Sequence, residues 1–328
     1  MKRDRRLFLA ATAMAALALA AGSTAAAAAY PTKTVTMVVA YPPGGDTDAM
    51  ARLYADKLSA RLKQPVIVEN RPGAAGVVGT SFVSRAPADG YTLLYTPNPF
   101  TLAPMVLKLA PAASYDPLHG FTPVIQTAVQ AVLLVANPAA GVKTVPEMIA
   151  AAKAGKNFTY GSPGAGSPMH IAGEMLNRAA GVNIQHVPYK GVAPAVNDVV
   201  AGHVNFAYVT LGPVAQYINT GKLIALAITD AKRSALLPNV PTLAELGYKD
   251  VVVGAWHGVM APKGTPPEVV KILNAQLNDV IKLPDVAEKM ATFGALPVGG
   301  APAALEKVNV SDYERLGKVI RDMGISAE

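Results

Sequence analysis

Short apolar runs alternate with amphipathic stretches along most of the chain, and this pattern predicts strands that alternate with helices. Val35 to Ala40 has the apolar character of a buried parallel strand, Ala49 to Leu62 that of an amphipathic helix, and Val66 to Glu69 that of the next strand. The other expected strands are 91–95, 157–160, 185–189, 204–209 and 223–229, and the other expected helices are 171–180, 193–201, 266–281 and 301–323. The alternation is typical of an α/β fold with mainly parallel sheets flanked by helices.

Two extended apolar segments interrupt this alternation, at 124–135 and 251–260. We interpret them as crossings between two lobes, with hinge points near 129–132 and 253–257. The first lobe is then discontinuous, formed by residues 30–128 and 258–328, and the second lobe is the continuous stretch 129–257. We expect a ligand cleft between the two lobes.

The N-terminus has the features of an export signal. Lys2, Arg3, Arg5 and Arg6 precede an apolar run from residue 7 to residue 21, and a small-residue tract offers cleavage after Ala29. The adjacent arginines fit the twin-arginine consensus or an ordinary signal equally well. Residues 1–29 are therefore expected to be a signal peptide and the mature chain to lie in the periplasm.

Composition excludes several functional classes. The sequence contains no cysteine, which excludes a disulfide scaffold, thiolate metal sites and cysteine nucleophiles. The whole chain has a net charge of +7, of which the signal carries four basic residues and one acid, so the mature chain has +7 − 3 = +4. Because the remaining basic residues are scattered, we expect no nucleic-acid partner.

Two glycine-rich turns each join a strand to a helix. The first is Tyr41-Pro-Pro-Gly-Gly-Asp-Thr-Asp48, and the second is Tyr160-Gly-Ser-Pro-Gly-Ala-Gly-Ser-Pro-Met-His170. The first N–H groups of a helix lack intrahelical partners and carry the positive end of the helix dipole, so such turns suit an anion. Tight turning alone would also explain the glycines. A third glycine-rich stretch, 70–79, has the pattern GxxGxxG, and close helix–strand packing explains it better than a nucleotide site.

Several stretches together resemble one known family. These are the first turn, Val68-Glu-Asn-Arg-Pro-Gly-Ala-Ala-Gly76, Ala88-Asp-Gly-Tyr-Thr-Leu-Leu94, Val187-Pro-Tyr-Lys-Gly191 and Trp256-His-Gly-Val-Met-Ala-Pro-Lys-Gly-Thr-Pro266. They look like the Bug-type periplasmic receptors of tripartite tricarboxylate transporters, and the resemblance covers essentially the whole mature chain. It implies a two-lobed periplasmic-binding-protein fold of type II that closes on a small carboxylate and passes it to membrane transport subunits. The chain departs from the family at Asn205, where an acidic residue is frequent, and in the variable loop around Asn98.

The resemblance implies that main-chain N–H groups, small hydroxyls and waters of the two turns hold the ligand. Neither turn contains Lys or Arg, which agrees with this mode of binding. We expect ligand contacts from both lobes and from strand ends beside the turns. The predicted ligand-binding residues are Tyr41, Gly44, Gly45, Thr47, Asp48, Asn98, Ser162, Gly164, Gly166, Ser167, His170, Tyr189 and Thr210.

Two of these residues have alternative roles. Asp48 would repel a carboxylate, so it orients water, caps the helix at Ala49 or meets a ligand amine. His170 either contacts the ligand as a neutral ring or fixes the turn.

An enzyme is the competing class, since the serine-rich turn suggests a hydrolase, but no GxSxG motif is present. The histidines lack metal-ligand spacing, so we expect no catalytic residue, no metal and no cofactor. A third class is a ligand-sensing receptor that docks on the ectodomain of a membrane kinase. We expect a monomer whose ligand is a dicarboxylate, a citrate-like acid, an acidic amino acid or an aromatic carboxylate.

Overall fold

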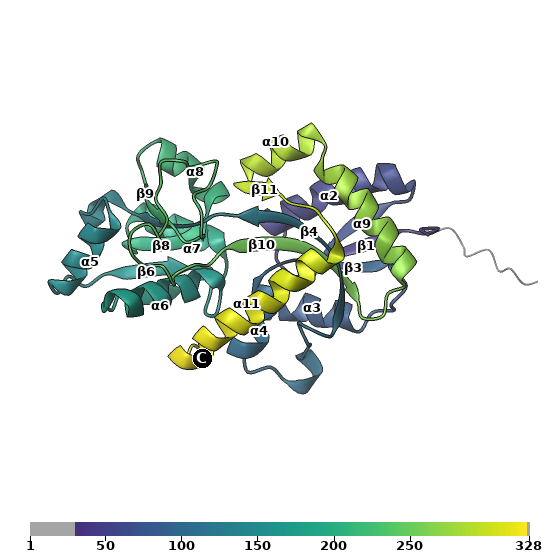
Figure 1. Ribbon diagram of the computed structural model, residues 1–328, viewed down its shortest axis with the longest axis horizontal. Coiled ribbons are helices and arrows are strands. Elements are labelled where there is room, and N and C mark those ends of the chain that lie inside the picture. Colours follow the sequence, from purple (N-terminus) through teal and green to yellow (C-terminus); the bar gives the residue numbers. More distant parts are fainter. Residues whose placement is uncertain (1–29, 327–328) are drawn as a thin grey trace, which may run out of the picture. The chain divides into compact units, whose positions relative to one another are not determined.

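Two β-sheets, each flanked by helices, organise the computed structural model, which describes residues 30–326 (Figure 1). Lys33–Glu328 forms one compact unit. The predicted signal peptide, residues 1–29, lies outside the described residues.

The first sheet has six strands in the order β11-β4-β10-β3-β1-β2. The bounds are β1 Val35–Val39, β2 Val66–Asn70, β3 Thr92–Pro97, β4 Phe121–Gln130, β10 Ala255–Pro262 and β11 Ala295–Pro297. Strands β1, β2 and β3 are parallel, whereas β10 runs antiparallel to β3 and β4, and β11 antiparallel to β4.

The second sheet has five strands in the order β7-β6-β8-β5-β9. The bounds are β5 Val132–Ala136, β6 Thr159–Ser162, β7 Gln185–Pro188, β8 Phe206–Thr210 and β9 Ile224–Ile228. Strand β6 is parallel to β7 and β8, and β5 is antiparallel to β8 and β9.

Both sheets are therefore mixed, and the expectation of mainly parallel sheets needs correction. Ala131 separates β4 in the first sheet from β5 in the second, and the chain returns to the first sheet at Ala255. A strand that leaves one sheet and a strand that comes back must run in opposite directions, which makes β4 and β10 antiparallel. The lobe boundaries stay a prediction, because sheet membership alone does not show which parts move as one body.

Helices cover the sheets. Their bounds are α2 Asp46–Leu62, α3 Val77–Ser84, α4 Pro99–Val106, α5 Val145–Lys153, α6 Pro168–Ala180, α7 Val192–Ala201, α8 Leu211–Asn219, α9 Pro267–Ile281, α10 Pro284–Thr292 and α11 Pro302–Met323, with 3₁₀ turns η1 Ala74–Gly76, η2 Pro111–Ala113 and η3 Pro138–Ala140. The longer helices begin and end within a few residues of their predicted limits. The sequence pattern did not indicate α4, α5, α8 and α10, which have only 8 or 9 residues each and show too few turns for a clear period.

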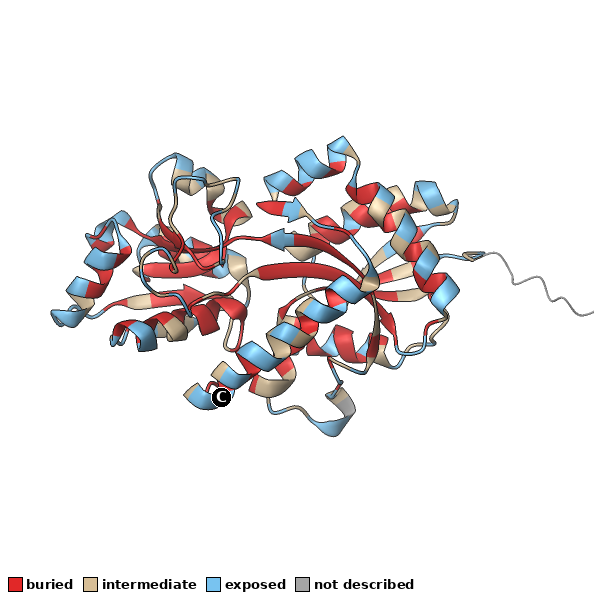
Figure 2. Cartoon of the chain, in the orientation of Figure 1, coloured by how far each residue is buried: buried red, intermediate tan, exposed pale blue. Residues whose placement is uncertain are grey.

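The inner strands are buried, the edge strands β2, β7 and β11 are only partly so, and the outer faces of the helices are exposed (Figure 2). One apolar cluster contains Leu102 and Val106 of α4 and Leu316 and Ile320 of α11 together with residues of the second sheet and of α6. Helices α4 and α11 therefore tie the two sheets together on one side by apolar packing. Between residues 30 and 326, no helix has the length and apolar character needed to cross a membrane.

Candidate functional site

The first glycine turn, at the end of β1, holds Asp48 in a structural role. Its carboxylate accepts hydrogen bonds from the Gly44 N–H at 2.9 Å, from Asn70 Nδ2 at 2.8 Å and from Arg52 Nε at 3.0 Å. Asp48 is 4% exposed. Burial alone would raise the pKa of Asp48, but the bonds from Arg52, Gly44 and Asn70 outweigh burial and lower it. Asp48 thus fixes the turn that leads into α2 and does not cap the helix, since Gly45 is the N-cap residue and α2 has no side-chain cap.

The same turn leaves the start of α2 open. Gly45 is the N-cap residue, and no side chain caps the helix. A Cβ atom added to Gly44 or to Gly45 would meet no atom within 4 Å, and both residues are exposed. The first N–H groups of α2 are thus accessible from the solvent side of the turn.

Asp46, the first residue of α2, reaches across to the second sheet. Its carboxylate accepts from Thr210 Oγ1 at 3.3 Å and from Gln130 Nε2 at 3.5 Å. Burial raises the pKa of Asp46, and these two bonds only partly offset the effect. Thr210 ends β8 and is the N-cap residue of α8, but its hydroxyl caps no N–H group of that helix. The N-terminus of α2, which follows a strand of the first sheet, therefore meets the N-terminus of α8, which follows a strand of the second sheet, at Asp46 and Thr210.

His257 on β10 lies beneath the first turn of α2. Its Nε2 is 3.2 Å from Thr47 Oγ1, and its ring stacks on Tyr95 with centroids 5.9 Å apart. His257 is 3% exposed, and burial lowers its pKa to about 3, so the ring is neutral. The other ring nitrogen, Nδ1, is buried without a hydrogen-bond partner.

The second glycine turn is built around a pair of stacked histidines. His170 on α6 and His186 on β7 have ring centroids 3.8 Å apart and planes inclined by 11°. Ser162 Oγ lies 2.7 Å from His186 Nε2, and His170 Nδ1 accepts from the Gly166 N–H at 2.9 Å. Burial lowers the pKa of His170 to about 4, and burial together with His170 lowers that of His186 to about 3. His170 thus fixes the turn, which is one of its two expected roles.

Most N–H groups of this turn donate within the turn. Ser162 Oγ accepts from Gly164, and the main-chain oxygen of Gly164 accepts from the Ser167 N–H. Ser167 Oγ in turn caps α6 by accepting from the His170 N–H at 3.2 Å. The polar groups of the second turn are therefore more completely hydrogen-bonded within the turn than those of the first. The uncapped start of α8, which follows strand β8 of the same sheet, is a second open helix end.

The remaining predicted residues lie at the edges of this region. Tyr41 donates to the main-chain oxygen of Ala75 at 3.4 Å, and Tyr189 donates to Asp198 at 2.6 Å. Burial and Asp198 raise the pKa of Tyr189 to about 12. Both tyrosines are half-buried.

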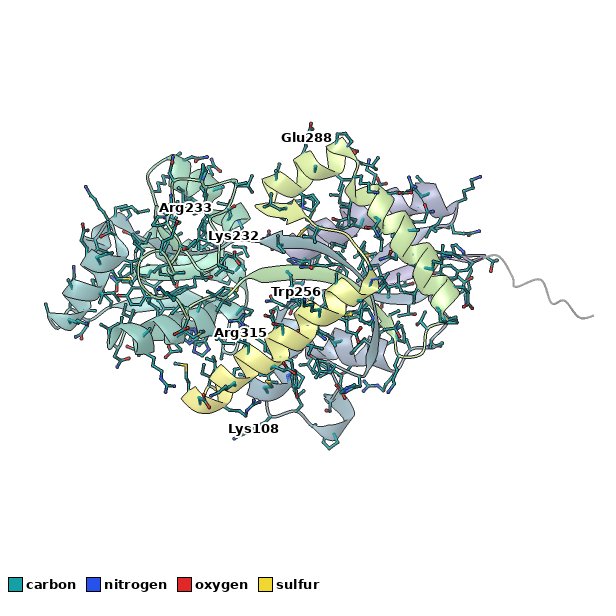
Figure 3. The ribbon with its side chains drawn as sticks, in the orientation of Figure 1. Lys108, Lys232, Arg233, Trp256, Glu288 and Arg315 are labelled. Atoms are coloured by element: carbon teal, nitrogen blue, oxygen red, sulfur yellow. The ribbon has the colours of Figure 1, made fainter. Side chains whose placement is uncertain are left out.

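Asn98 ties the end of β3 to the second crossing. It is 1% exposed, and its Nδ2 donates to the Gly254 oxygen at 2.9 Å. Trp256 Nε1 donates to Asp312 on α11, and Arg315 on the same helix donates to the Val252 oxygen at 2.6 Å (Figure 3). This network gives Asn98 a structural role at the crossing.

The structure brings Thr47 and Thr210 together through Asp46 and groups Ser162, Gly164, Gly166, Ser167 and His170 around the histidine pair. Sequence reasoning missed Asp46, Gln130, His186 and His257. Asp46 lies in the first glycine turn, and its position at the start of a predicted helix could have identified it as a site residue. The partners of the other three depend on tertiary contacts.

The contacts argue against a serine nucleophile. Ser162 is fully buried, and its hydroxyl also donates to the Gly164 oxygen at 3.2 Å. His186 is too weak a base, given its depressed pKa, and among the described residues no carboxylate bonds its other nitrogen. Within residues 30–326, no group of three or more potential ligand side chains is placed to hold a metal ion.

Two cavities lie away from the predicted turns. One, of about 350 Å³, is bordered by Met105, Asp116, His119 and Tyr313. The other, of about 170 Å³, lies between α8 and the turn after α10, with Leu211, Ile218, Leu237 and Gly294 among its lining residues. The second cavity adjoins the open start of α8.

Comparisons with known proteins agree with this architecture. The sequence profile of the tripartite tricarboxylate transporter family receptor matches residues 50–325. The chain is 38% identical to protein BugT of Bordetella pertussis over 296 residues, which is 90% of each chain.

Two solved structures are similar throughout. A Rhodopseudomonas palustris protein solved with adipate has a TM-score of 0.83 and 34% identity, covering 90% of this chain and 99% of that one. MatC from Rhodopseudomonas palustris with bound malate has a TM-score of 0.79 and 31% identity, covering 89% of this chain and 100% of that one. These matches confirm the predicted resemblance and the predicted periplasmic-binding-protein fold.

Proposed function

Because the chain belongs to the receptors of the tripartite tricarboxylate transporter family, we propose that it binds a small carboxylate between two lobes and delivers it to membrane transport subunits. As a member of this family it is a periplasmic solute-binding receptor and not an enzyme. The proposed lobes are residues 30–128 with 258–328, and residues 129–257. The proposed export signal is residues 1–29.

One observation carries the proposed binding mode. The N-termini of α2 and α8, which follow strands of different sheets, meet at Asp46 and Thr210 with 3.3 Å between their side-chain oxygens, and neither helix has a side-chain cap. Each open helix end favours negative charge by about 0.3–1 kcal/mol at an exposed site and more when partly buried. A ligand with two carboxylates can place one near each helix end without an arginine clamp. The relatives solved with adipate and malate support a dicarboxylate as the ligand class.

Closure is proposed to pivot on the side where α4 and α11 pack against the second sheet. That side is joined by apolar side chains such as Val106 and Ile320, whereas Asp46, Thr210 and Gln130 supply polar contacts at the helix ends. Polar contacts exchange readily for water or ligand, but separation of an apolar contact exposes its surface to water. The lobes therefore open at α2 and α8, and a ligand that binds both shifts the population toward the closed form.

Thermal unfolding of the mature chain, from Tyr30 onward and stripped of ligand by refolding, tests the proposal against malate, adipate and other carboxylates. A ligand at 100 times its dissociation constant adds about 2.7 kcal/mol to stability, which gives a clear shift in the midpoint. The variant Gly45→Leu fills the space in front of α2. Because Gly45 has φ of −84° and an added Cβ meets nothing within 4 Å, the variant should fold normally yet bind at least ten-fold more weakly.

Ala139→Leu is the matched control, since it adds an exposed leucine in η3 and should leave affinity unchanged. Unchanged affinity in Gly45→Leu would place the site elsewhere while leaving the receptor function intact. A flat response of the wild type to every carboxylate would refute the ligand class. Delivery is tested by uptake into vesicles that carry the membrane subunits, with and without the receptor.

A further inference from the structure

Asp46 and Asp48 lie two residues apart on α2 but differ in how their charges are balanced. Asp48 receives hydrogen bonds from Arg52, Asn70 and Gly44, of which Arg52 is a cation. The recorded partners of Asp46 among the described residues are the neutral side chains of Thr210 and Gln130, at 3.3 Å and 3.5 Å. One carboxylate is thus neutralised by the fold, and the other is not.

The bonds to Asp46 leave much of its acceptor capacity unused. An ionised carboxylate has about four lone-pair sites, and Asp46 accepts two long bonds from neutral groups. Charge-assisted hydrogen bonds are typically shorter, about 2.7–2.9 Å for a cationic nitrogen donor. A donor from outside the chain can therefore be accommodated at Asp46 without displacing its present partners.

His257, which contacts the first turn of α2, has one ring nitrogen without a hydrogen-bond partner. His257 contacts Thr47, the neighbour of Asp46, through Nε2 at 3.2 Å, while its Nδ1 is buried without a partner and the residue is 97% buried. Buried polar atoms without partners are rare in folded proteins, and each calls for a specific explanation. Asp46, which keeps spare acceptor capacity beside the uncapped start of α2, is the group at this turn that a donor of a ligand can complete.

We propose that Asp46 sets the specificity of the cleft, so that the receptor prefers carboxylates which also carry an ammonium or hydroxyl group over plain dicarboxylates. This inference rests on the proposed function. The helix ends attract the carboxylates of such a ligand, while Asp46 accepts a hydrogen bond from its donor group. A plain dicarboxylate offers no donor and is repelled by Asp46, because like charges at short range raise the cost of binding.

Ligand sets that differ at a single carbon test the proposal. Succinate, malate and aspartate share one skeleton and carry hydrogen, hydroxyl or ammonium at one position, and glutarate, 2-hydroxyglutarate and glutamate form a longer set. Titration calorimetry of the wild type should give at least ten-fold tighter binding for the ammonium or the hydroxyl member than for the plain member of its set. Comparison of those two members shows which donor the site takes.

Asp46→Asn removes the charge while its amide oxygen can still accept from Thr210. The preference should fall to three-fold or less, and the plain dicarboxylate should bind more tightly than it does to the wild type. Asp279→Asn removes the same charge from an exposed site on α9 and should leave all ratios unchanged.

Equal affinities within each set for the wild type, or equal preferences in the wild type and Asp46→Asn, would overturn the role of Asp46 and leave the carboxylate site standing. If no member of either set bound to the wild type, both this inference and the proposed dicarboxylate class would be wrong.

Discussion

Gly212, the second residue of α8, lies against the turn that follows α10. A Cβ atom added at Gly212 would be 2.5 Å from the main-chain oxygen of Phe293, although ordinary van der Waals contact begins near 3.4 Å. The oxygen belongs to the backbone and accepts from Gln130 Nε2 at 2.8 Å, so it cannot turn away as a flexible side chain would. Gly212→Ala therefore forces the start of α8 and the turn at Phe293 apart by about 3.4 − 2.5 = 0.9 Å.

This shift is large enough to break the contact between the helix ends. If the bond from Thr210 to Asp46 lengthens by the same amount, it reaches about 3.3 + 0.9 = 4.2 Å and is lost. A hydrogen bond of this kind contributes about 1 kcal/mol, which corresponds to about a five-fold loss of closed population and of ligand affinity. Within α8 itself, alanine is favoured over glycine by about 0.5–1 kcal/mol, so thermal stability should change by no more than about 0.5 kcal/mol.

The absence of cysteine from the sequence allows site-specific labelling for the distance measurement. Lys232→Cys and Glu288→Cys introduce exposed labels on the two sides of this contact, and both residues are labelled in Figure 3. Pulsed electron resonance should show a longer mean distance in Gly212→Ala than in the parent protein. Calorimetric titration with a ligand found in the thermal screen measures the affinity.

Gly173→Ala is the matched comparison. Its added Cβ would lie 2.5 Å from the ring of Tyr160. Because Gly173 on α6 and Tyr160 on β6 both belong to the second sheet and its helices, the variant should lower stability and leave the label distance unchanged. An unaltered distance and unaltered affinity in Gly212→Ala would refute the reasoning that α8 and the Phe293 turn close against each other.

Two further predictions concern stability. Burial raises the pKa of Asp230 to about 7, against 3.8 in the unfolded chain. The contribution of the protonated carboxyl to the free energy of unfolding is therefore fully present below about pH 4 and is lost as the pH rises through 7. Chemical unfolding should show that Asp230→Asn raises the free energy of unfolding, relative to the wild type, by about 2 kcal/mol more at pH 8 than at pH 5, with solvent screening taken into account. An equal increase at the two pH values would contradict the raised pKa. Lys63 ends α2 with φ of 53°, so Lys63→Gly should raise the free energy of unfolding by about 1 kcal/mol without changing ligand affinity; a loss of stability would show that the lysine side chain contributes more than its strain costs.

Much of the fold could be predicted because it depends on local pattern. The strand Val35–Val39 and the helices α2, α7, α9 and α11 follow apolar periodicities that a single sequence displays. The glycine turns were also visible, since helix starts and strand ends have characteristic residues. The short helices were not, because one or two turns contain too few apolar positions to establish a period.

The candidate site shows the same division. Gly45 and Ser167 were predicted from their places in the glycine turns at helix starts, and Thr210 from its place after a strand. Each is an N-cap residue in the structure, although the helix that begins after Thr210 was not predicted. A structural role for Asp48 was expected as a cap of α2, but the residue instead holds the preceding turn through the N–H of Gly44. Contact with a ligand stays a prediction for all thirteen residues.

The sequence by itself determined the α/β pattern, the two glycine turns and the family resemblance, all of which depend on residues close together in the chain. Only the tertiary structure decided which polar groups are satisfied. Asp46 meets Thr210 across 164 positions, and Thr47 meets His257 across 210. Such partners are set by strand order and by the direction in which the chain re-enters a sheet, and a local pattern of polar and apolar residues does not specify either.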